Sequence, residues 1–243
     1  MRIGIFDSGV GGLTVLKTLI EKYPMNEYIY YGDTLNIPYG SKTIGELEIL
    51  SDKDVKFLIE KQVDMIIIAC GTVSSNCLNY LRRKYNIPIY DIISPTIKYL
   101  NESNYSNILV IATERTIDSH IFKNNLLKNV IEIITPSLVP LIESNNLDNI
   151  DDELEMYFSE YKDKIDVLVL GCTHYPVIRQ EISNYFGNKI DVLDMSSLLV
   201  DKIEDGKISS VDIYFSKLNS TIIDNVKKIL ELDDVNIYES KNC

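Results

Sequence analysis

The stretch Ile66–Ser75, IIIACGTVSS, decides how the rest of the chain is interpreted. A run of β-branched apolar residues ends in Cys70, and a glycine and small polar residues follow. A strand that is apolar at every position is typical of a parallel sheet covered on both faces. A helix that begins directly after Cys70 would direct free backbone N–H groups at the thiol, which favours the thiolate. The alternative is a cysteine that packs in the core as a small apolar residue.

A second stretch of the same design, VLVLGCT at residues 167–173, places Cys172 at the end of another apolar run. Strand-like runs that begin at Ile3 and Ile108 precede the two cysteines by similar distances. This coarse repeat predicts two successive α/β halves, each with one cysteine at a strand tip, where α/β folds bind ligands. The polar segment at residues 101–107 is the boundary that the pattern favours.

Strand-like runs alternate along the chain with segments of helical length, such as residues 43–61 and 74–84. The tail from about Gly206 contains one helical stretch, 220–232, and a last strand. The expected strands are residues 2–8, 27–33, 63–70, 87–93, 106–113, 131–136, 165–172, 189–195 and 235–240.

The composition excludes several classes of protein. The 243 residues carry a net charge of −12, so a general nucleic-acid-binding role is disfavoured by repulsion from phosphate. No apolar run is long enough to span a membrane and no signal peptide is visible, which predicts a cytoplasmic protein without a membrane partner. Four cysteines without a CxxC pair and only two histidines make a metal site unexpected.

The segment GCTHYP brings Cys172 and His174 close together, and a neighbouring histidine can lower the pKa of a thiol or hold its proton. His174 could instead be a satisfied polar residue at a strand end. In FDSGVGG, Asp7 ends a strand before a glycine-rich turn, which suits an ammonium group or acid–base chemistry; the alternative is an N-cap. Tyr39 and Gly40 lie in a rigid loop, and Glu143 is either a buried acid or a solvated helix residue.

Five segments occur together in a characteristic order: GIFDSGVGGLTVL, YYGDTLNIPYGSK, IIIACGT, PSLVPLIE and LGCTHYP. In order and spacing they resemble the glutamate racemase family, within the cofactor-independent aspartate/glutamate racemase superfamily. The resemblance implies two pseudo-symmetric parallel-sheet α/β domains that face each other across a central cleft. Residues 1–96 plus 207–243 would form the first domain and residues 97–206 the second.

The resemblance also implies a chemistry that uses two cysteines. Inversion of an α-carbon without a cofactor needs a base on one face and an acid on the other, and two thiols can exchange these roles. Cys70 and Cys172 would be those groups, with Asp7 supporting Cys70, and with His174 and Glu143 supporting Cys172. The implied substrate contacts are Asp7, Ser8, Tyr39, Gly40, Gly71, Thr72, Thr113, Thr116, Thr173 and His174.

Further expectations follow from the same resemblance. The product would be D-glutamate for peptidoglycan, hence for the cell wall and cell shape, and the protein would be a homodimer. No cofactor and no metal would be needed. The chain starts directly at its first strand, so we expect no regulation through the N-terminal extension with which some relatives bind a nucleotide-sugar activator.

The chain departs from the family pattern at Gly71, where the family has asparagine. Loss of that side chain removes one polar contact to substrate, worth about 1–3 kcal/mol. A water could replace it, the enzyme could be slow, or the glycine could make room for another substrate. Gly71 leaves open a racemase of aspartate or another amino acid. Two alternatives of other classes are a non-catalytic protein that binds an acidic amino acid and a Cys–His hydrolase.

Overall fold

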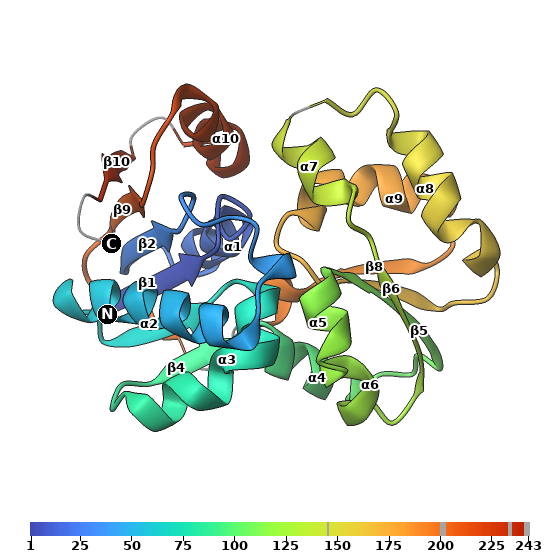
Figure 1. The fold of residues 1–243 in the computed structure, drawn as a ribbon, viewed down its shortest axis with the longest axis horizontal. Helices are drawn as coiled ribbons and strands as arrows, with labels where there is room; N and C mark the ends of the chain where they lie inside the picture. The colour runs from blue at the N-terminus through green and yellow to red at the C-terminus, as the bar shows by residue number, and fades with distance from the viewer. Residues whose placement is uncertain (145, 200–202, 233–234, 241–243) are drawn as a thin grey trace.

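The computed structural model describes residues 1–144, 146–199, 203–232 and 235–240, and within these the chain forms two parallel sheets (Figure 1). The first has the strand order β10–β9–β2–β1–β3–β4 and the second the order β6–β5–β7–β8. The strands are β1 Arg2–Asp7, β2 Glu27–Gly32, β3 Met65–Ile68, β4 Ile89–Asp91, β5 Asn107–Ala112, β6 Asn129–Ile134, β7 Val167–Leu170, β8 Asp191–Asp194, β9 Ser210–Phe215 and β10 Asn236–Glu239.

Helices pack around each sheet (Figure 1). Those of the first half are α1 Leu13–Lys22, α2 Ile44–Glu60, α3 Gly71–Lys84, α4 Ile93–Glu102 and α10 Ser220–Leu230, with a 3₁₀ turn η1 at Tyr39–Ser41. Those of the second half are α5 Glu114–Asp118, α6 Ile121–Asn125, α7 Leu138–Glu143, α8 Ile150–Phe158 and α9 Arg179–Tyr185, with 3₁₀ turns η2 Ser159–Tyr161, η3 Tyr175–Ile178 and η4 Met195–Leu198.

The two halves repeat one topology, which confirms the predicted fold class. The order β2–β1–β3–β4 in the first sheet matches β6–β5–β7–β8 in the second, and neighbouring strands in both series pair in parallel. Cys70 follows β3 and Cys172 follows β7, the equivalent strand. From β1 the chain first adds β2 on one side and then β3 on the other, so the strand order switches direction between β1 and β3, and likewise between β5 and β7. In α/β folds, ligands bind at the carboxyl ends of the strands that flank such a switch point.

The core explains why the apolar runs became central strands. All four residues of β3 and of β7 are buried, as expected for parallel strands covered on both faces. One cluster of buried side chains continues from the first sheet through α4 and η4 to the second sheet, with Ile93 and Met195 among its members. The two halves therefore share a core where the chain crosses between them.

Each strand expected from the sequence is present, and β9 is an additional strand that pairs between β2 and β10. The chain crosses to the second sheet through α4 and returns between η4 and β9. The domain limits 96/97 and 206/207 fall within these crossings and stay a prediction. Of the four cysteines, Cys243 lies outside the described residues. Among the helices that the structure describes, none has the length and apolar character of a membrane span.

Candidate active site

The predicted residues gather where the carboxyl ends of the two sheets face each other. Parallel pairing of Phe6 with Ile68 brings the residues after β1 beside those after β3, so Asp7 lies next to Cys70 in the fold. Pairing of Ile111 with Leu170 does the same for Thr113 and Cys172 in the second half. Each sheet thus contributes one cysteine and one polar neighbour from the adjacent strand end.

Cys70 is the N-cap residue of α3 and is 4% exposed. Its Sγ lies 3.6 Å from Oγ of Ser8. Burial, and after it the negative charge of Asp7, raises the pKa of the Cys70 thiol to about 12. The helix starts where the sequence predicted, and the backbone N–H of Val73 does lower this pKa, but burial and Asp7 outweigh it. In the absence of substrate Cys70 is therefore a thiol, in contrast to the thiolate expected from its position.

Cys172 has a different environment. Its Sγ lies 3.6 Å from Nδ1 of His174, and Nε2 of the same ring lies 3.0 Å from Oε1 of Glu143, at the end of α7. Burial alone would lower the pKa of His174, but the hydrogen bonds to Cys172 and Glu143 raise it well above its usual value. A protonated imidazole donates to both neighbours and stabilises negative charge on the sulfur.

Asp7 is fully buried and links the two halves. Its Oδ2 accepts hydrogen bonds from the N–H groups of Gly9 and Gly12, which shapes the glycine-rich turn before α1. Its Oδ1 accepts from the hydroxyl of Thr173 in the second half at 3.4 Å. Asp7 is not the N-cap of α1, which is Gly12; it holds the turn that precedes the helix, and its charge acts on Cys70 as well.

Threonine hydroxyls form a second link across the cleft. Oγ1 of Thr72 lies 2.9 Å from Oγ1 of Thr113, which lies 3.0 Å from Oγ1 of Thr116. Thr113 also approaches the η1 loop, since a Cβ on Gly40 would lie 2.9 Å from Cβ of Thr113. Hydroxyls in this arrangement can turn to donate to a substrate carboxylate.

The structure reveals one site feature that the sequence reading missed. The hydroxyl of Tyr39 donates to Oδ2 of Asp33 at 2.7 Å and lies 3.4 Å from Oδ2 of Asp54. Burial and the nearby charge of Asp33 raise the pKa of Asp54 well above its usual value. Asp33 could have been noticed, because it follows β2 as Asp7 ends β1; nothing in the sequence pattern pointed to Asp54.

Gly71 opens no extra space. A Cβ at this position would lie 2.6 Å from the carbonyl oxygen of Gly171, on the opposite half. The space beside Gly71 is filled by backbone, so the idea that glycine here makes room for a different substrate has no support in the structure.

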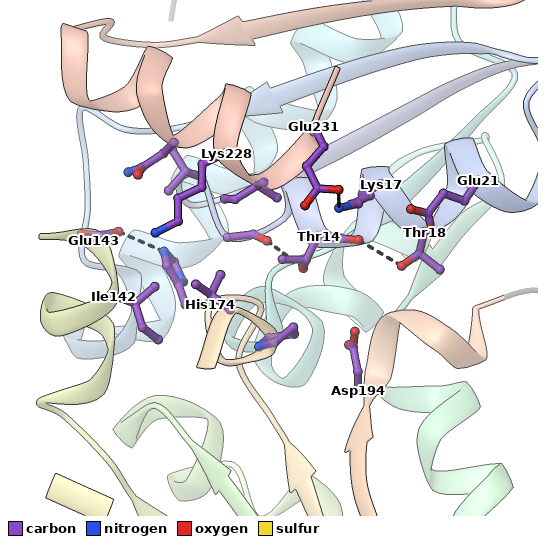
Figure 2. A pocket seen from close by; sticks show the side chains of 16 residues that line it. Thr14, Lys17, Thr18, Glu21, Ile142, Glu143, His174, Asp194, Lys228 and Glu231 are labelled. Carbon is purple, nitrogen blue, oxygen red and sulfur yellow. Dashed lines mark hydrogen bonds and ion pairs between the residues drawn. The ribbon is translucent and has the colours of Figure 1, made fainter. Parts of the chain in front are cut away.

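A cavity of about 350 Å³ lies beside the His174–Glu143 pair. Figure 2 shows both side chains facing each other at its edge, with Lys228 of α10 extending toward them. The cavity is lined by residues of α1, α7 and α10, including Thr14 and Thr18, and neither cysteine is among its lining residues. It therefore borders His174 and Glu143 but not the two thiols.

Two matching parallel sheets, each followed by a cysteine at an equivalent strand tip, define a two-domain α/β protein with a candidate site between its halves. The chain belongs to the Asp/Glu/hydantoin racemase family, whose sequence model matches residues 28–203. It is 37% identical to the glutamate racemase of Aquifex pyrophilus over 243 residues, which covers 96% of this chain and 95% of that one.

Two further relatives agree with this assignment. The glutamate racemase of Fusobacterium nucleatum subsp. nucleatum is 42% identical over 210 residues, covering 83% of this chain and 79% of its own. The crystal structure of glutamate racemase from Campylobacter jejuni subsp. jejuni superposes on this chain with a TM-score of 0.88 and a sequence identity of 33%. The match covers 96% of this chain and 100% of that one. Membership of this family makes the protein an isomerase, as the sequence predicted.

Proposed function

We propose that this protein interconverts L- and D-glutamate without a cofactor, using Cys70 and Cys172 as the two bases. The observation that carries the proposal is the placement of one buried cysteine after each of two equivalent strands, β3 and β7, in halves that face each other. The names of the similar proteins support glutamate as the substrate.

The unequal surroundings of the two thiols fit such a reaction. A two-base racemase must hold one thiolate and one thiol when substrate binds, because one removes the α-proton and the other supplies a new one. His174, whose pKa is raised by its hydrogen bonds to Cys172 and Glu143, is placed to donate to the Cys172 sulfur, whereas burial raises the pKa of Cys70. The Cys172 thiolate takes the proton from Cα, and the Cys70 thiol gives its proton to the opposite face. Afterwards Cys172 is a thiol and Cys70 a thiolate, ready for the reverse reaction.

The remaining predicted residues act as substrate contacts in this proposal. Thr72, Thr113 and Thr116 supply hydroxyls, and the η1 loop supplies backbone groups near Gly40. These groups bind carboxylates without a permanent positive charge, which suits a protein of net charge −12. Asp7 is placed to accept from the substrate ammonium group, together with its bonds to Gly9, Gly12 and Thr173.

The cellular role follows from the same proposal. A racemase of this kind supplies D-glutamate to peptidoglycan from the cytoplasm, and we propose that it acts there as a homodimer. Light scattering coupled to size-exclusion chromatography tests the dimer, with a mass near 27.8 kDa as the contrary result.

The substrate is tested by incubating the protein with L- and D-glutamate and with L- and D-aspartate in D2O, without added cofactor. NMR follows loss of the α-proton and circular dichroism follows inversion. The proposal predicts exchange and inversion with both enantiomers of glutamate. Reaction with aspartate alone would change the substrate, and binding without any exchange would favour a non-catalytic binding protein.

A further inference from the structure

The two halves approach each other backbone to backbone at the residues that adjoin the two cysteines. Gly71 follows Cys70 in the chain, and Gly171 precedes Cys172. A Cβ on Gly71 would lie 2.6 Å from the carbonyl oxygen of Gly171, and ordinary contact begins at 3.4 Å. The backbones that carry the two thiols therefore touch at a point where no side chain fits.

Neither partner in this contact can retreat within its own half. The N–H of Gly171 donates to the carbonyl oxygen of Ile111 at 2.8 Å, and a Cβ on Gly171 would itself lie 2.6 Å from that oxygen. Gly71 is buried at the first position of α3, where the carbonyl of Cys70 accepts from the N–H of Ser74. A side chain at position 71 would consequently be accommodated only by moving the halves apart.

Two other glycines of the first half also face the second half, but against side chains. A Cβ on Gly11 would meet Oγ1 of Thr173 and Nδ1 of His174, and a Cβ on Gly40 would meet Cβ of Thr113. The side-chain ends of Thr173 and His174 can rotate away, whereas the carbonyl of Gly171 and the Cβ of Thr113 are held by their backbones. Of the two contacts that side-chain rotation cannot relieve, the one at Gly71 is the shorter, at 2.6 Å against 2.9 Å.

We propose that the backbone contact between Gly71 and Gly171 sets the separation of the Cys70 and Cys172 thiols, which makes Gly71 a positioning residue for inversion. This inference rests on the proposed two-thiol reaction. In that reaction one thiolate removes the α-proton and the opposite thiol protonates the carbanion. If the halves stand further apart, the opposite thiol reaches the carbanion less often, and the first thiol returns a proton to the same face after exchange with solvent.

The test compares Gly71→Ala with Gly45→Ala as the matched control, since a Cβ on Gly45 in α2 meets nothing within 4 Å. L-Glutamate is supplied in D2O, and deuterium in the recovered L-glutamate is measured against the D-glutamate formed. For Gly71→Ala we expect kcat to fall by about 100-fold, because a displacement of roughly 1 Å has such effects, while KM changes by less than about threefold. The ratio of exchange to inversion should rise by about tenfold. Gly45→Ala should match the unmodified protein.

A readout independent of activity is the rate at which iodoacetamide alkylates each cysteine, followed by mass spectrometry. In Gly71→Ala both cysteines should react about tenfold faster than in Gly45→Ala, because the halves no longer close over them.

The variants should fold, because the conflict lies between the halves and not within either one. Loss of the folded state in Gly71→Ala would place the role of Gly71 inside the first half and overturn the inference. An active Gly71→Ala protein with unchanged exchange-to-inversion ratio and alkylation rates would overturn it as well, while leaving the proposed function intact. If the unmodified protein exchanges no substrate, the proposed function fails, and alkylation alone still decides whether Gly71 controls closure.

Discussion

At the scale of the residue, Cys70 and Cys172 hold equivalent places in the fold but have unlike neighbours. Cys70 lies near the buried carboxylate of Asp7, and Cys172 lies beside a histidine whose pKa is raised by its hydrogen bonds to Cys172 and Glu143. The sequence supported both cysteines, His174 and Asp7 as candidates, since each follows an apolar strand. It could not predict the raised pKa of Cys70, because burial and the charge of Asp7, which is distant in sequence but near in space, act on the thiol only in the folded chain.

Glu143→Gln tests whether Glu143 acts on Cys172 through His174, which contacts both residues. Loss of the carboxylate removes one of the contacts that raise the pKa of His174, so the imidazole should lose its proton at lower pH. We expect kcat/KM for the enantiomer that Cys172 deprotonates to fall by about tenfold to 100-fold, and its alkaline limb to move to lower pH. Rates measured from pH 6 to 10 provide the check. An unchanged pH profile would show that Glu143 does not act through His174.

His174 should also make stability depend on pH. Its folded pKa lies above the unfolded value of about 6.5, so its contribution is fully present below that pH and is lost as pH rises through the folded pKa. The difference in unfolding free energy between the unmodified protein and His174→Asn should therefore shrink as pH rises above about 7. Urea unfolding at several pH values measures it. A difference that grows with pH would contradict the raised pKa.

At the scale of the element, the strand ends and the η1 loop build the site, and most of this was predictable. Continuous apolar runs marked β1, β3, β5 and β7. The strand β9 was missed because its sequence, SVDIYF, mixes polar and apolar residues, and only Ile213 and Phe215 are buried. Its place was determined by pairing with β2 and β10, which the local pattern does not contain.

Asp33 and Asp54, the two carboxyls that contact Tyr39 of η1, give a stability prediction. Asp33 accepts from Tyr39, from Asn36 and from Ser216, so Asp33→Asn should cost about 1–3 kcal/mol, since an amide leaves donors facing donors. Burial raises the pKa of Asp54 and favours its neutral form, so Asp54→Asn, nearly the same shape, should cost less than about 1 kcal/mol near neutral pH.

The pH dependence distinguishes the two acids. A carboxyl with a raised folded pKa stabilises the fold below its unfolded pKa of about 3.9 and loses that contribution as pH rises through the folded value. Asp54→Asn should therefore gain stability relative to the unmodified protein between pH 5 and pH 9, in chemical unfolding experiments. A loss of relative stability over that range would mean that Asp54 is ionised in the folded state.

At the scale of the whole molecule, contacts between segments distant in sequence close the cleft. Nε of Arg115 on α5 donates to the carbonyl of Lys42 in the first half at 2.9 Å, and Nδ2 of Asn76 lies 3.3 Å from the carbonyl of Arg115. The repeat in the sequence predicted two facing halves. It could not predict these contacts, because neither Arg115 nor Asn76 stands out in a local pattern.

Arg115→Ala should weaken closure without removing a reacting group. Loss of one hydrogen bond worth about 0.5–1.5 kcal/mol should raise KM by about twofold to tenfold and leave kcat within about twofold. Arg83→Ala, at an exposed position of α3, is the control. Steady-state kinetics in both directions provide the measurement, and a KM equal to that of the control would rule out this role for Arg115.

The most direct test of the two-thiol reaction is α-proton exchange in D2O by Cys70→Ser and Cys172→Ser. Each variant should lose inversion by at least about 1000-fold, and each should retain exchange with one enantiomer only, the two variants with opposite ones. This result is expected because each remaining thiol faces one side of the α-carbon. Undiminished inversion by Cys70→Ser would contradict the account, because it would mean that Cys172 and His174 carry the reaction without the opposite thiol.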